Sequence, residues 1–151
     1  MPSAARHTLA KDERLHGRNA VENLFQKAKR SSMVVFPLRA VYTIATGGEP
    51  GLDSPVKILV SVSKKHFKRA VKRNRVKRQV REAYRKNKHS LCSAIAAVPG
   101  ASMQLAFIWL DDELHPSEKV EASVVSLLAR IEEKSMRIIQ ADGGREIDIQ
   151  P

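Results

Sequence analysis

The side chains best suited to chemistry in this sequence are cations, and they are concentrated in one segment. Residues 64–88 contain 13 lysines and arginines and one acid, Glu82, which gives the segment a net charge of +12. The whole chain of 151 residues has a net charge of +11, so its remaining 14 basic and 15 acidic residues nearly cancel. Each phosphate that a lysine or arginine neutralises releases a condensed counterion, so such a segment is suited to binding a polyanion. We therefore expect a nucleic acid partner.

A second group of reactive types, Asp111-Asp112-Glu113 with His115, has the chemistry of a metal site or a general acid-base pair. A solvated loop after a strand explains this group better, because no further ligands of defined spacing exist elsewhere. The other histidines are scattered, and no set of nucleophile, base and orienting group is evident. We therefore expect no catalytic residue, and no metal or cofactor bound by the protein.

The single cysteine, Cys92, has no partner for an internal disulfide and lacks the paired spacing of a zinc site. We interpret it as a small buried apolar residue in a reducing compartment. The chain has no run of about 18 apolar residues and no secretory signal at its N-terminus. These features predict a cytoplasmic protein that does not associate with membranes.

A helix over residues 69–87 must position the cations. Its apolar residues fall at i, i+4, i+7 and i+8, which places them on one stripe. They are Val76, Val80, Ala83 and Tyr84. At 100° per residue the opposite side carries Asn74, Lys77, Arg78, Arg81 and Arg85. A run of like charges is often a disordered arm, but this apolar spacing favours a folded helix with a cationic outer face.

The other segments predict a single α+β domain, a two-layer sandwich with the order α-β-β-(β)-α-β-α. We expect it to span residues 1–140, with residues 1–8 flexible and residues 141–151 a disordered tail. The expected elements are a helix over 18–30, a strand over 34–45, a loop over 47–55, a strand over 56–63, the basic helix, a short helix over 90–98, a mid-sheet strand over 103–110 and a long helix opened by Pro116-Ser117. Val120, Val124, Leu127, Leu128 and Ile131 form the expected buried stripe of this last helix.

Residues 70–81, Ala-Val-Lys-Arg-Asn-Arg-Val-Lys-Arg-Gln-Val-Arg, resemble the signature helix of the bacterial ribonuclease P protein family. Residues 61–65, Ser-Val-Ser-Lys-Lys, resemble the strand end that precedes this helix, and a looser similarity extends over residues 9–139. The resemblance implies that the basic helix lies in a left-handed strand-helix-strand crossover, which is rare. It also implies a protein that binds ribonuclease P RNA and precursor tRNA, without an obligate protein partner. The resemblance further implies that the RNA removes the 5′ leader of precursor tRNA using Mg²⁺, and that the protein alone is inactive.

The resemblance and the charge pattern together give the expected binding residues. Those expected to contact the catalytic RNA are Lys64, Lys65, Arg69, Arg73, Asn74, Arg75, Lys77, Arg78, Arg81 and Arg85. By position in the family, Phe25 and Tyr42 would line a cleft and stack on unpaired bases of the leader. Val21 stands where the family often has a second cleft aromatic. Without the resemblance, both aromatic residues are more typical of a hydrophobic core.

Two other functions are compatible with the charge pattern. One is a ribosomal or ribosome-assembly protein with a related α+β fold and a basic helix. The other is a nuclease that works without RNA, for which Asp111 and Asp112 are the candidate residues. Stimulation of ribonuclease P RNA by the protein distinguishes the ribonuclease P interpretation from the ribosomal one. Cleavage by the protein without any RNA partner would support the nuclease.

Overall fold

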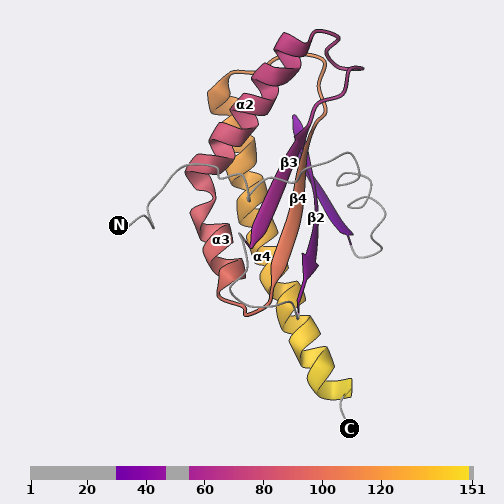
Figure 1. Cartoon of the computed structure of the whole chain (residues 1–151), viewed down its shortest axis with the longest axis vertical. Coiled ribbons are helices and arrows are strands. Elements are labelled where there is room, and N and C mark those ends of the chain that lie inside the picture. The colour runs from indigo at the N-terminus through magenta and orange to yellow at the C-terminus, as the bar shows by residue number, and fades with distance from the viewer. Residues whose placement is uncertain (1–29, 47–54, 150–151) are drawn as a thin grey trace.

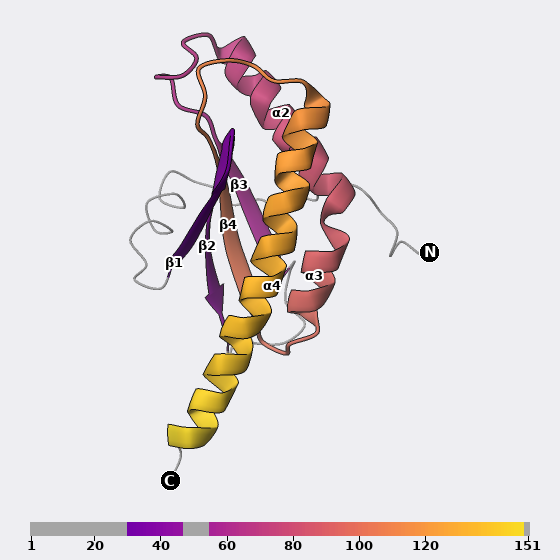
Figure 2. The same ribbon diagram turned by 180° about the vertical axis from the view of Figure 1, so that it is seen from behind.

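The computed structural model describes residues 30–46 and 55–149, with side chains as far as Gln140. In this part of the chain four strands form one sheet, and three helices lie on one of its faces (Figure 1; Figure 2). The strands are β1 (Arg30–Val35), β2 (Leu38–Ala45), β3 (Val56–Ser61) and β4 (Ser102–Trp109). The helices are α2 (Ala70–Asn87), α3 (His89–Ala96) and α4 (Ser117–Ile149). The α+β prediction is confirmed; of the helix predicted over residues 18–30, residues 18–29 lie outside the described residues, and Arg30 begins β1.

The sheet has the strand order β1-β2-β4-β3, so β4 lies in the middle, as its apolar sequence predicts. β2 pairs antiparallel with both β1 and β4, and β3 pairs parallel with β4. A parallel pair needs a crossover connection, and here that connection is α2 followed by α3. The basic helix therefore lies within a strand-helix-strand crossover.

The prediction of one strand over residues 34–45 is wrong, because the segment folds as a hairpin. β1 and β2 are joined by a tight turn at Phe36-Pro37, whose peptide bond is cis. Proline has a fixed φ and no N–H to donate, so it is excluded from the interior of a central strand. Pro37 therefore ends one strand and begins the next.

The two faces of the sheet differ in what covers them. On the helix side the alternate strand residues Leu38, Ala40 and Tyr42 join the main core with Val76 and Val80 of α2. On the opposite face a smaller cluster forms around Val41 and Ala106. The apolar stripes predicted for α2 and α4 are both buried in the main core, which fixes the two helices against the sheet.

The C-terminal segment differs from its prediction. Residues 141–149 continue α4, although a disordered tail was expected from residue 141. Once a helix is formed, each added residue gains one backbone hydrogen bond, and no proline interrupts the chain before Pro151. The lack of apolar periodicity therefore does not end the helix.

Candidate RNA interface

The direction of the strands brings three connections to one end of the sheet. β3 and β4 run parallel and end there, and β2 runs against β4 and begins there. We call this the loop end; it contains the turn at residues 36–37 and the loops at residues 62–69 and 110–116. α2 and α4 both begin at the loop end (Figure 1; Figure 2). The start of the basic helix therefore lies at the same end of the molecule as these three connections.

Exposed cations cover the loop before α2 and continue along the first half of the helix. We call this set the basic surface; it consists of Lys64, Lys65, Lys68, Arg69, Lys72, Arg75 and Arg78, all of which are exposed. The first turn of α2 contains no acidic residue, and the N-cap residue Arg69 makes no side-chain capping bond. The backbone N–H groups of this first turn and the positive end of the helix dipole therefore add to these charges. Such a surface is suited to binding the phosphates of a nucleic acid.

α2 is held rigidly by polar contacts as well as by its buried stripe. The Gln79 amide nitrogen donates to the carbonyl oxygen of His115 and to the Ser117 hydroxyl, both at 3.0 Å. At the C-terminal end of the helix, the Asn87 amide nitrogen donates to a carboxylate oxygen of Glu121 at 3.0 Å. Both contacts tie α2 to α4 or to the loop before it. The cations of the basic surface thus project from a fixed scaffold, which confirms the prediction of a folded helix over residues 69–87.

Arg73 has a different environment from the one predicted for a phosphate-binding residue. It is half-buried, and its Nη1 atom donates to the carbonyl oxygens of Phe67 at 2.8 Å and Lys68 at 2.7 Å. The Phe67 side chain is buried in the main core. Arg73 therefore holds the loop that carries Lys64, Lys65 and Lys68 in place. Its role in this structure is to position the basic surface.

Arg85 is paired with the one acid of the basic segment. Its Nε atom donates to Glu82 Oε2 at 3.0 Å, and its Nη2 atom donates to Glu82 Oε1. This bidentate contact lowers the pKa of the Glu82 carboxyl and raises the pKa of the Arg85 guanidinium. Glu82 offsets the charge of Arg85, so this end of α2 attracts a polyanion less strongly than the basic surface does.

Three further residues are predicted to contact the catalytic RNA. Of these, Asn74 is exposed, and Lys77 and Arg81 are half-buried.

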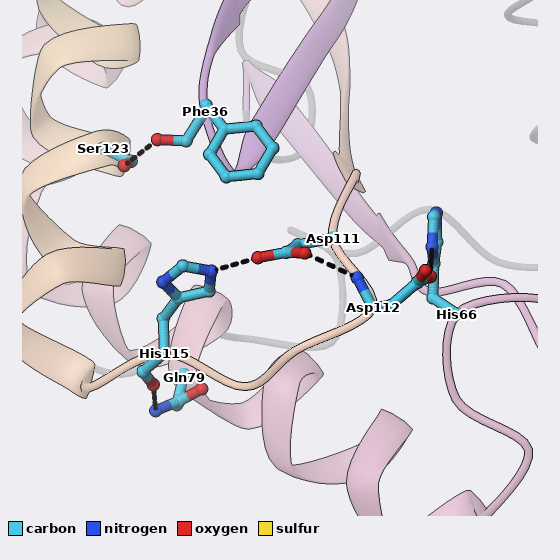
Figure 3. A network of polar contacts seen from close by, with 7 residues as sticks. All are labelled: Phe36, His66, Gln79, Asp111, Asp112, His115 and Ser123. Atoms are coloured by element: carbon cyan, nitrogen blue, oxygen red, sulfur yellow. Dashed lines mark hydrogen bonds and ion pairs between the residues drawn. The ribbon is translucent and has the colours of Figure 1, made fainter.

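The acidic group predicted to be a solvated loop has a structural role at the loop end (Figure 3). Asp112 Oδ1 lies 2.7 Å from His66 Nδ1, which joins the loop after β4 to the loop before α2. Asp111 Oδ2 lies 2.5 Å from His115 Nε2, and this contact lowers the pKa of the Asp111 carboxyl. Within residues 30–46 and 55–140, no three His, Cys, Asp or Glu side chains are grouped so that they could hold a metal ion.

The prediction that Tyr42 lines a cleft for unpaired bases requires a correction. The alternation of β2 places Tyr42 on the same face as Leu38 and Ala40, beneath α4, and its side chain is 1% exposed. Burial raises the pKa of its phenol, and the hydroxyls of Ser31 and Ser135 offset part of the rise. A ring buried in this way has no free face for a base, so Tyr42 is a core residue here. Phe25 lies outside the described residues.

We expect Arg73→Lys to loosen the loop before α2 without changing the charge. A lysine ammonium does not reproduce the guanidinium fork, so both carbonyl contacts are weakened and the free energy of unfolding falls by about 1–3 kcal/mol. Hydrogen exchange measured by mass spectrometry should show faster exchange at the amides of residues 64–69. Unchanged exchange in this loop would contradict the positioning role of Arg73.

Comparisons with known proteins agree on one family. The family model described as Ribonuclease P matches residues 9–132. The Ribonuclease P protein component of Porphyromonas gingivalis (strain ATCC 33277) is 43% identical over 131 residues, covering 87% of this chain and 91% of that protein. The component of Chlorobaculum tepidum is 32% identical over 147 residues, covering 94% and 93%.

Two solved structures share the fold. The RNase P protein from Thermotoga maritima has a TM-score of 0.56 at 24% identity, covering 79% of this chain and 97% of that one. An RNase P protein mutant of Staphylococcus aureus, described as defective in mRNA degradation activity, has a TM-score of 0.58 at 18% identity. The match with the S. aureus structure covers 81% of this chain and 90% of the S. aureus chain. At these identities the structures support the architecture alone.

Proposed function

The chain belongs to the ribonuclease P protein family, and from this premise we propose that it is the protein subunit of a ribonuclease P holoenzyme. Its partner is ribonuclease P RNA, which performs the hydrolysis that removes the 5′ leader of precursor tRNA. We further propose that the RNA uses Mg²⁺ for this step and that the holoenzyme acts in the cytoplasm. Because the chain belongs to this family, we do not propose that it is a ribosomal or ribosome-assembly protein.

The observation that carries the proposal is the basic surface on a rigid helix. The catalytic RNA and precursor tRNA are both polyanions, so they repel each other when they meet. Fixed cations between them reduce this repulsion, and they do so without the entropic cost of ordering a flexible arm. The protein thereby favours the assembled complex while the RNA supplies the chemistry.

Among the described helices, none is long and apolar enough to cross a membrane.

We also propose that the holoenzyme contacts the single-stranded leader of its substrate. Unpaired strands are commonly bound by cations together with aromatic faces. Tyr42 does not offer such a face in this structure, so the leader contact depends on other residues. Phe25 remains a proposed member of that contact.

Reconstitution tests the proposed function. At physiological salt and low Mg²⁺ concentration, purified protein should increase cleavage of precursor tRNA by ribonuclease P RNA by at least about tenfold, since the cations lower the repulsion between the two RNAs. With the protein present, precursor should bind more tightly than mature tRNA, and without it the two should bind alike. The protein alone should not cleave precursor. Absence of stimulation would overturn the assignment, and equal affinities for the two substrates would overturn the leader contact.

A further inference from the structure

Phe36 is the aromatic side chain whose exposure the proposed function does not explain. Its residue is 55% exposed, whereas the other aromatic residues in the described part of the chain are at most 4% exposed. Those buried residues are Tyr42, Phe67, Tyr84, Phe107 and Trp109. An exposed phenyl ring gains nothing from the core, so stability alone does not favour phenylalanine at this turn.

The exposed ring is held in a fixed place. The Phe36 carbonyl oxygen accepts a hydrogen bond from the Ser123 hydroxyl at 3.2 Å, and the Pro37 carbonyl oxygen accepts one from the Leu110 amide at 2.9 Å. These contacts attach the hairpin turn to α4 and to the end of β4. A rigid turn positions its side chain before any partner arrives, which reduces the entropic cost of binding.

The ring itself packs edge to face against His115. The two ring centroids lie 6.1 Å apart with an interplanar angle of 84°. His115 is in turn fixed by its contact with Asp111 and by packing against the buried Trp109 ring, at a centroid distance of 5.5 Å. His115 therefore supports Phe36 from the protein side, and the exposed part of the ring faces solvent.

The surroundings of Phe36 indicate the chemistry of its partner. The Phe36 ring packs against His115, which contacts Asp111, and the neighbouring Asp112 contacts His66, as Figure 3 shows. His66 belongs to the loop that carries Lys64, Lys65 and Lys68 of the basic surface. A rigid aromatic ring at the same end of the molecule as a group of exposed cations is the combination that binds unpaired nucleotides, because bases stack on the ring and phosphates pair with the cations.

We propose that Phe36 is a stacking site for an unpaired base of ribonuclease P RNA, at the same end of the molecule as the basic surface. This inference rests on the proposed function and adds a contact that recognises a base instead of a phosphate. The ring face accepts any base, so the contact selects unpaired structure and not sequence. It also explains why the turn that bears the ring is tied to both α4 and β4.

Two substitutions at Phe36 separate stacking from simple apolar contact. Phe36→Leu keeps an apolar side chain but removes the ring, and we expect it to weaken binding to ribonuclease P RNA by about tenfold. Phe36→Tyr keeps the ring and should retain wild-type affinity. The slope of log K against log salt concentration should be unchanged in both variants, because no phosphate contact is lost. Thermal melting should be close to wild type, since the ring is largely exposed.

A spectroscopic variant tests the same contact directly. Phe36→Trp adds an exposed tryptophan to the single native one, the buried Trp109, and a base stacked on the added ring should quench its emission when the RNA binds. Wild-type affinity for Phe36→Leu, equal losses for Phe36→Leu and Phe36→Tyr, or unquenched emission in the bound Phe36→Trp complex would each overturn the proposal. Failure of the wild-type protein to bind ribonuclease P RNA would instead overturn the proposed function.

Discussion

Replacing Arg75 and Arg78 together with glutamine is expected to weaken binding to ribonuclease P RNA by about thirtyfold at physiological salt, because each lost phosphate contact forgoes about a fivefold gain from counterion release. Both side chains are exposed on α2, three residues apart and therefore on the same side of the helix. The buried stripe lies elsewhere on the helix, so the substitutions should leave its packing intact. Titration of labelled RNA with each protein at one salt concentration measures the effect.

The chain offers a control with the same change in net charge. Arg130 and Lys134 are exposed on α4, outside the basic surface. Arg130→Gln with Lys134→Gln removes two charges from outside the basic surface and should change affinity by less than about threefold, since only long-range attraction is lost. An equal loss in the two double variants would mean that net charge, and not its placement on α2, controls binding.

Tyr84→Ala is expected to lower the free energy of unfolding by about 3–5 kcal/mol, the usual cost of deleting a buried aromatic ring. Tyr84 is fully buried, and its ring packs edge to face against Phe107 of β4 at a centroid distance of 6.2 Å. It therefore fastens the second half of α2 to the middle of the sheet. Chemical denaturation followed by circular dichroism measures the loss.

Tyr84→Phe is the matched control, because it keeps the ring and removes only the hydroxyl. The Tyr84 oxygen lies 3.5 Å from Cys92 Sγ, and losing a hydroxyl contact costs less than losing a buried ring, so this variant should cost about 0.5–1.5 kcal/mol. If Tyr84→Ala lowered the free energy of unfolding no more than Tyr84→Phe does, the packing of the Tyr84 ring on β4 would not be what fixes α2 against the sheet.

The periodicity of the sequence predicts the basic helix well. The buried residues of α2 are Val76, Val80, Ala83 and Tyr84, the four placed on one stripe by their spacing. This agreement has a physical cause, since a helix of 3.6 residues per turn can bury only one such stripe. The central position of β4 follows in the same way from apolar residues on both faces.

The roles of individual side chains depend on contacts that spacing does not reveal. Arg73 is predicted to bind phosphate, but it donates to the carbonyls of Phe67 and Lys68, and the spacing of charges does not reveal that these acceptors are within its reach. Tyr42 is buried because the alternation of β2 places it on the face of the sheet that the helices cover, and the sequence of a strand does not say which face that will be. The proline in Phe36-Pro37 was the one available signal for the hairpin turn.

The central claim is that the basic surface of α2 carries the phosphate contacts, and the salt dependence of binding tests it most directly. The slope of log K against log salt should fall by about two in Arg75→Gln/Arg78→Gln and should stay at the wild-type value in Arg130→Gln/Lys134→Gln. The same slope in all three proteins would contradict the claim.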